Sequence, residues 1–248
     1  MTNKHIKIFS NLDDLSQAAA EYFISLAAKS IRKRGYFSVA LSGGGTPKPL
    51  YKALGSPDQQ SRLDWKNIHL FWGDERCVPP EHPDSNYRMV REEMLSNITI
   101  AAENINRVPA ELEAHKAAFS YEEKLRGFFQ GEWPRFDLVL LGMGDDGHTA
   151  SLFPHSAGLN EEQRWFIANY APEPDTWRLT LTKNAINAAR HIAVIVAGDS
   201  KAEVLADVLE GVYQPDVTPI QLIGPKNGHM IWFLDQAAAK KLVDPEKP

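Results

Sequence analysis

The stretch GMGDDGHT, residues 142–149, places a histidine, two carboxylates and three glycines directly after the apolar run FDLVLL. Asp146 lies two residues before His148. A carboxylate at this spacing can fix the tautomer and orientation of an imidazole, which then accepts a proton from water. Glycines let a substrate lie against backbone N–H groups that stabilise a developing oxyanion. We therefore take His148 as a candidate general base and Asp146 as its orienting partner, although a lone histidine in a loop can also be a packed or surface residue.

The glycines of this stretch also satisfy the G-x-G-x-x-G pattern of a dinucleotide-binding turn, at Gly142, Gly144 and Gly147. That turn needs a helix directly after the glycines, with its N–H groups facing a pyrophosphate. Pro154 and Gly158 interrupt any long helix here, and two carboxylates occupy the place of the pyrophosphate. The sequence argues against a nucleotide site.

A second glycine-rich loop contains residues suited to binding phosphate. It follows the apolar run YFSVAL and precedes a proline that suits the first turn of a helix. Free backbone N–H groups at a helix start favour an anion, although a tight strand-to-helix turn would also explain the glycines. The candidate residues are Ser42, Gly43, Gly44, Gly45 and Thr46.

Three cationic side chains are further candidates for holding an anion. Arg76 belongs to the triplet DER, which we expect in a loop, and its guanidinium can grip a phosphate with two N–H groups. Lys201 opens a helix, where the helix dipole disfavours a cation unless an anion is held there, although an exposed lysine on a solvated face is the alternative. Arg178, at the start of the run RLTLT, is a weaker candidate for a ligand contact.

Asp74 is included among the candidate substrate contacts because it begins the same triplet as Arg76. Whether Asp74 and Glu75 touch substrate or only brace the arginine stays open at this point. Ser85 is expected to cap the following helix, because a serine oxygen can accept a free N–H at a helix start. Asn86 is left as a less favoured ligand contact.

Alternating strand-like and helical patterns are expected to position these residues. The chain reads as an α/β protein with a mostly parallel central sheet and helices on both faces, Rossmann-like, in one domain over residues 1–248. In such folds ligands bind beyond the carboxyl ends of the strands, where the candidate residues lie. Strands are predicted at 5–9, 36–42, 67–73, 136–142, 165–171, 177–182, 191–198 and 230–235, and helices at 12–34, 47–54, 85–95, 111–130, 201–209 and 236–242.

The composition excludes several classes of function. A net charge of −5 gives no general attraction to nucleic acid or to an anionic membrane. Cys77 is the only cysteine, and the eight histidines show no metal-ligand spacing, so we expect no disulfide and no metal. No segment has the length of a membrane span or the apolar core of a signal peptide. A cytoplasmic protein is expected.

Taken together, the motifs SGGGTP, WGDERCVP, SNY, GMGDDGHTASLFP, RLTLT, GDSKAE and WFLDQAAA occur in an order that resembles the 6-phosphogluconolactonases. The resemblance spans residues 37–239 and implies hydrolysis of 6-phospho-D-glucono-1,5-lactone, the second step of the oxidative pentose phosphate pathway. It implies a carboxylic ester hydrolase that needs no cofactor and is often monomeric, with the fold of the sugar-phosphate isomerases and deaminases. It also implies that His148 is the general base, that Asp146 orients it, and that Arg76 and Lys201 hold the 6-phosphate.

Two other functions are compatible with this fold. Glucosamine-6-phosphate deaminases resemble the chain in the phosphate loop and the D-G-H turn, but they carry a carboxylate five residues beyond the histidine, where this chain has Phe153. A sugar-phosphate-binding regulatory module would usually carry a DNA-binding domain, for which the chain has no spare segment. Trp177 departs from the lactonase pattern and puts the substrate contacts of its loop in doubt.

Overall fold

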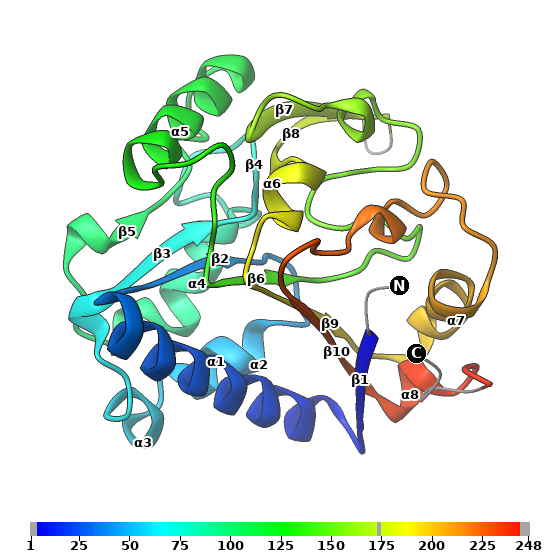
Figure 1. Ribbon diagram of the computed structural model, residues 1–248, viewed down its shortest axis with the longest axis horizontal. Coiled ribbons are helices and arrows are strands. Elements are labelled where there is room, and N and C mark those ends of the chain that lie inside the picture. Colours follow the sequence, from blue (N-terminus) through cyan, green and yellow to red (C-terminus); the bar gives the residue numbers. More distant parts are fainter. Residues whose placement is uncertain (1–3, 173–174, 244–248) are drawn as a thin grey trace.

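The computed structural model describes residues 4–172 and 175–243, and within them seven parallel strands form a central sheet (Figure 1). Every neighbouring pair in this sheet is parallel. In spatial order the strands are β1 (Lys4–Phe9), β10 (His229–Asp235), β9 (His191–Val196), β6 (Leu138–Leu141), β2 (Phe37–Leu41), β3 (Ile68–Trp72) and β5 (Ile105–Asn106).

Helices cover the large sheet on both sides, as the sequence predicts. In Figure 1, α1 and α2 lie on one side of the sheet, and α5 lies on the other side together with a smaller sheet. The helices are α1 (Leu12–Arg34), α2 (Lys48–Leu54), α3 (Pro57–Gln60), α4 (Asn86–Glu93), α5 (Ala114–Phe128), α6 (Lys183–Asn187), α7 (Ala202–Glu210) and α8 (Gln236–Ala239).

Local signals explain why α1 has the predicted bounds. The side chain of Asn11 accepts a hydrogen bond from the backbone N–H of Asp14 at 2.9 Å and so caps the first turn. Gly35 adopts a left-handed conformation with φ 83° and donates its N–H to the carbonyl of Ile31, which ends the helix. Both ends of the longest helix are therefore set by single residues.

The order of the strands brings the candidate loops together. β9, β6, β2 and β3 are consecutive in the sheet, so the loops that leave their carboxyl ends lie at one edge. Every residue of β2 and β6 is buried, as expected for central parallel strands covered on both faces. From β2 the chain moves to β3 and then β5 on one side. It then returns to β6, on the other side of β2, and continues in that direction to β9 and β10. The site therefore lies where the direction of winding reverses, the usual ligand position in open α/β sheets.

A second sheet corrects part of the prediction. The strands predicted at 165–171 and 177–182 form, as β7 (Phe166–Ala171) and β8 (Thr176–Leu181), but they pair antiparallel to each other outside the central sheet. The triplet DER is not a loop: it is β4 (Asp74–Arg76), and it pairs with β8. Three charged residues have low strand propensity, and only this long-range pairing makes them a strand.

Several helix ends also differ from prediction. The helix predicted at 111–130 is α5, which begins after Glu113, whose carboxylate accepts the N–H groups of His115 and Lys116. The predicted last helix ends at Ala239 rather than at residue 242. Among residues 4–172 and 175–243, no helix combines the length and apolar character that crossing a lipid bilayer requires.

Candidate active site

Three loops and the strand β4 line a cavity of about 240 Å³ at the carboxyl edge of the large sheet. The loops follow β2, β6 and β9, and β4 follows β3; these are the four strands after which the sequence places its candidates. The cavity lining includes all but two of the predicted site residues, namely Ser42, Gly43, Gly44, Gly45, Thr46, Asp74, Arg76, His148 and Lys201. Asp146 and Arg178 are not in its lining and lie directly beside residues that are.

His148 and Asp146 form the predicted pair. The Nδ1 atom of His148 lies 2.5 Å from Oδ1 of Asp146, and the same oxygen accepts the backbone N–H of His148 at 3.0 Å. Partial burial acts to raise the pKa of Asp146, but these hydrogen bonds outweigh it and lower the pKa. An ionised carboxylate only accepts hydrogen bonds, so Nδ1 of His148 carries the proton. The lone pair of the neutral ring is then on Nε2, on a side chain that lines the cavity.

The glycine at position 144 makes room for this pair. A Cβ atom there would lie 2.1 Å from His148 Nδ1 and 2.5 Å from Asp146 Oδ1, which no real side chain tolerates. The N–H of Gly144 donates to the carbonyl of His148 at 2.9 Å and so closes the loop on itself. Gly147 has φ 76°, a conformation that favours glycine, and its carbonyl accepts the N–H of Ile220. The loop therefore holds the imidazole in one place.

Phe153 packs against the candidate base. Its ring centroid lies 4.6 Å from that of His148, with an angle of 39° between the planes. The side chain is almost fully buried and has no group that can transfer a proton. The position five residues beyond the histidine therefore places an apolar ring against the candidate base.

The loop after β2 presents unpaired backbone donors to the cavity. Tyr51 on α2 donates its hydroxyl to the carbonyl of Ser42 at 2.7 Å and accepts the N–H of the same residue, which fixes the start of the loop. From Gly43 to Thr46, no backbone N–H donates a hydrogen bond to any described residue. Gly44 has φ 88°. The segment can therefore offer N–H groups to an anion.

The structure separates the roles of the carboxylates in β4. Glu75 is buried and accepts hydrogen bonds from the N–H groups of Arg76, Asn86 and Tyr87. Burial nevertheless raises its pKa to about 7. Glu75 therefore braces the start of α4, whose cap is Ser85 as predicted, because the serine oxygen accepts the N–H of Arg88.

Asp74 reaches the cavity, whereas Asn86 supports it from behind. The carboxylate of Asp74 accepts the hydroxyl of Ser151 at 2.8 Å and faces the Asn86 amide at 3.4 Å. Asn86 also packs on Gly43, where a Cβ atom would lie 1.9 Å from its Oδ1. Ser151 was not among the sequence candidates, because no spacing signal links it to the triplet at residues 74–76.

The three cations have different surroundings. Arg76 donates to the carbonyl of Asp84 at 2.9 Å, and Arg178 lies opposite Arg76 in the antiparallel pair β4–β8. Lys201, just before α7, forms an ion pair with Asp145 at 2.6 Å. The sequence predicts that an anion balances this lysine at the helix start, and in the structure Asp145 supplies that charge. Sequence reasoning missed this pair because its two residues are far apart along the chain.

Trp177 lies away from the cavity. Its indole packs edge-on against His115 of α5 at 4.7 Å and near Tyr170 of β7 at 5.5 Å. Within residues 4–172 and 175–243, no three histidine, cysteine, aspartate or glutamate side chains gather as a metal ion would require.

Comparisons with known proteins agree with this geometry. The family model described as glucosamine-6-phosphate isomerases/6-phosphogluconolactonase matches residues 10–232. A 6-phosphogluconolactonase of Synechocystis is 42% identical over 242 residues, which covers 96% of this chain and 98% of that protein. One from Nostoc is 41% identical, over 96% of this chain and 98% of that protein.

Solved structures with the same fold superpose on most of this chain. The 6-phosphogluconolactonase of Trypanosoma brucei superposes with a TM-score of 0.87 at 28% identity, over 98% of this chain and all of that one. A monomeric glucosamine-6-phosphate deaminase superposes with a TM-score of 0.78 at 19% identity, over 96% of this chain and 99% of that one, and shows the shared fold alone. The chain belongs to the glucosamine-6-phosphate isomerase/6-phosphogluconolactonase family. Within that family, the relatives described here at 41% and 42% identity are 6-phosphogluconolactonases.

Proposed function

We propose that this protein hydrolyses 6-phospho-D-glucono-1,5-lactone to 6-phospho-D-gluconate, the second step of the oxidative pentose phosphate pathway. The observation that carries the proposal is the His148–Asp146 pair beside a cavity that also contains Arg76 and Lys201. A phosphorylated ester suits a cavity that has both a base, which can serve hydrolysis, and a cluster of hydrogen-bond donors that can hold one phosphate group. The names of the relatives support the same substrate.

In this mechanism His148 activates water. With Nδ1 held by Asp146, Nε2 takes a proton from a water molecule as its oxygen attacks the C1 carbonyl of the lactone. Backbone N–H groups of the glycine-rich loops face the oxyanion of the tetrahedral intermediate. When the bond from C1 to the ring oxygen breaks, the imidazolium returns the proton to that oxygen, which leaves as a hydroxyl group. The carboxylic acid product then ionises.

Phosphate recognition is assigned to the side of the cavity formed by β4 and by the loops after β2 and β9. Arg76 and Lys201 supply positive charge, and the segment from Gly43 to Thr46 supplies N–H groups. Arg178 adds positive charge beside Arg76, and Asp74 is held in place by the hydrogen bond that it accepts from Ser151. These contacts persist through ground and transition state, so they serve affinity more than turnover.

Glucosamine-6-phosphate deamination is the competing reaction. Phe153 weighs against it, because an apolar ring against His148 occupies the position where deaminases carry a proton-transferring carboxylate. The remaining parts of the proposal rest on the sequence: a cytoplasmic location, a monomeric state, one domain over residues 1–248, and no need for a cofactor or nucleic acid.

The test measures two reactions on the same preparation. Hydrolysis of freshly generated 6-phosphogluconolactone is followed by proton release and corrected for spontaneous opening, and ammonia release from glucosamine-6-phosphate is measured beside it. We expect acceleration of the first reaction and none of the second. Ammonia release without lactone hydrolysis would replace the proposal with the deaminase, and no turnover in either assay would reject both enzymes.

A further inference from the structure

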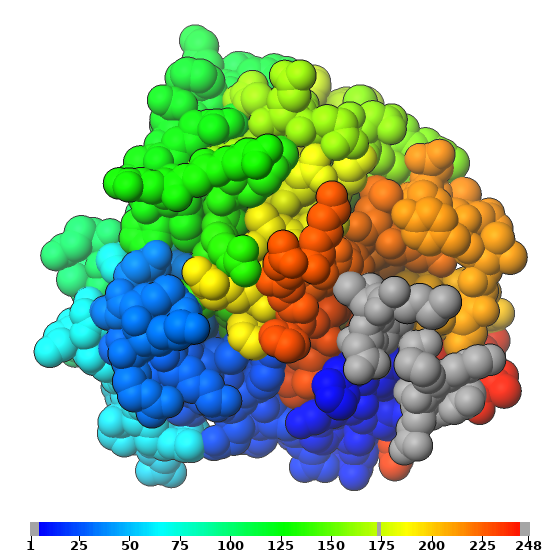
Figure 2. Space-filling view, in the orientation of Figure 1, coloured from blue at the N-terminus to red at the C-terminus, as the bar shows by residue number. Residues whose placement is uncertain are grey.

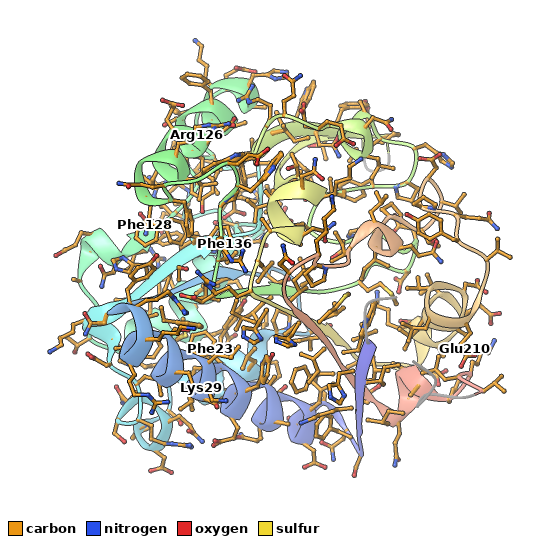
Figure 3. The ribbon with its side chains drawn as sticks, viewed as in Figure 1. Phe23, Lys29, Arg126, Phe128, Phe136 and Glu210 are labelled. Carbon is orange, nitrogen blue, oxygen red and sulfur yellow. The ribbon has the colours of Figure 1, made fainter. Side chains whose placement is uncertain are left out.

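A second cavity, of about 540 Å³, lies at the opposite edge of the large sheet from the candidate active site. Its walls are the last turns of α1, the segment before β6, the start of β9 and the segment before β10, which meet on the face shown in Figure 2. Lys29 projects from α1 on this side (Figure 3). The cations in the lining are Lys29, Lys33, Arg34, Arg135, Arg190 and Lys226.

This positive charge is poorly balanced. None of the described residues that line the cavity is an aspartate or a glutamate. Asp137, buried beneath the cavity, forms an ion pair with Arg34 and another with Arg190, whose Nε lies 3.3 Å from it. One carboxylate thus serves two guanidinium groups. The Nε atoms of both arginines are buried and donate no hydrogen bond to any described residue.

The helix dipole accounts for only part of the cluster. Lys33 and Arg34 stand in the last turn of α1, where the negative end of the dipole favours cations. Arg135, Arg190 and Lys226 come from three other segments, so the dipole does not explain their convergence. In a protein with a net charge of −5, six cations around one cavity are a local concentration that repels itself.

A half-buried histidine lies next to these cations. His191 lies in the cavity wall, with its Nδ1 atom 3.0 Å from the hydroxyl of Tyr22 and its ring stacked on that of His229. Burial, and then the charges of His229, Lys29 and the neighbouring arginines, lower the pKa of His191 to about 4. The charges of Lys29 and the arginines thus add to the effect of burial in disfavouring a further positive charge at this place.

We propose that this cavity binds a small metabolite carrying a pyrophosphate group, at a site separate from the active site. Guanidinium groups bind phosphate oxygens through paired N–H donors, and three arginines line this cavity, Arg34, Arg135 and Arg190. Six cations exceed what a single phosphate needs, and the volume is in the range that holds a nucleotide-sized ligand. The proposal does not depend on the proposed activity, because the cavity shares no lining residue with the active site.

The test is calorimetric titration of the full chain with inorganic pyrophosphate and, separately, with ADP, at low ionic strength. The variant is the double substitution Lys29→Ala and Lys33→Ala, since neither lysine has an ion pair among the described residues and the fold does not depend on them. We expect binding to the wild type and a loss of affinity of at least about tenfold in the variant, the loss of charged hydrogen bonds. Arg32→Ala, an exposed cation on the same helix outside the cavity, is the matched control and keeps wild-type affinity.

A second variant separates this site from the active site. Arg76→Ala removes a cation from the active-site cavity and is expected to leave pyrophosphate binding unchanged. The proposal is overturned if the wild type binds neither probe at about 1 mM. It is also overturned if binding survives in the double lysine variant, or if Arg76→Ala abolishes it, because the probe would then occupy the active site.

Discussion

Arg76 and Arg178 face each other as direct partners in the antiparallel pair β4–β8. Like charges at such positions destabilise a sheet unless a third group balances them. Burial, and then the charge of Arg76, lower the pKa of Arg178. The charges of Asp74 and Asp84 partly offset this effect, but among the described residues neither carboxylate forms an ion pair with either arginine. A bound phosphate would relieve this repulsion.

Arg76→Ala should therefore weaken substrate binding more than catalysis. We expect KM for 6-phosphogluconolactone to rise at least about tenfold, the loss of a charge-assisted hydrogen bond, with a smaller change in kcat. Steady-state kinetics on the phosphorylated lactone and on gluconolactone make the comparison. Arg88→Ala is the control, because Arg88 is a half-buried arginine on α4 that pairs with Glu92. An equal loss on both lactones would place Arg76 away from the phosphate.

His148→Ala should lower kcat by about 10²–10⁴-fold, the usual contribution of a positioned base. The control is His155→Asn, because His155 is exposed and has φ 57°, which asparagine tolerates. Both variants are compared with the wild type in the proton-release assay, and circular dichroism verifies folding. Near-normal turnover in His148→Ala would remove this residue from the mechanism.

A single methyl group at position 144 should disrupt the pair of His148 and Asp146. In Gly144→Ala the new Cβ overlaps the ring of His148 and the carboxylate of Asp146, so the imidazole must move. A displacement of about 1 Å costs about 10²-fold in rate, which we expect in kcat. Gly127→Ala is the matched control, because that glycine lies in α5 with open space around its Cβ position. Full activity in Gly144→Ala would mean that the observed pair is not the reactive arrangement.

Asp145 and substrate should compete for Lys201. Because the lysine already pairs with this aspartate at 2.6 Å, phosphate must share or replace the contact. Lys201→Ala is expected to raise KM for the phosphorylated lactone, whereas Asp145→Asn is expected to lower it. Lys66→Ala, at an exposed lysine just before the amino end of β3, keeps the wild-type KM. If Lys201→Ala and Asp145→Asn raise KM equally, Asp145 positions the lysine and does not compete with the phosphate for it.

The stability of the fold should depend on pH through His191. Its pKa is about 4 in the folded protein, against an ordinary value of 6.5. Between these values the unfolded chain binds a proton that the folded chain does not, so the free energy of unfolding falls as the pH falls from about 6.5 to about 4. Urea unfolding at several pH values should show a flatter dependence for His191→Gln. His5→Gln, at an exposed residue of β1, should keep the wild-type dependence of the free energy of unfolding on pH. The same dependence in all three proteins would contradict the lowered pKa of His191.

Local signals in the sequence predict much of this structure, and long-range pairing explains what they miss. Asn11 and Gly35 bound α1 as expected, because capping acts within a few residues. The strand at Asp74–Arg76 could not be predicted, since its stability comes from β8, about a hundred residues later. The same limit hides the pair of Lys201 and Asp145. Residue types predicted which side chains gather at this cavity and the local pair of His148 and Asp146, but not the distant partner of Lys201.

The candidate base and the candidate phosphate-binding arginines belong to different sheets. The loop with His148 follows a strand of the large parallel sheet, whereas Arg76 and Arg178 belong to the small antiparallel one. We therefore expect substitutions in β8 near Arg178 to change the affinity for the phosphorylated substrate while the His148–Asp146 pair stays in place. Substrate preference and turnover would then change through separate substitutions.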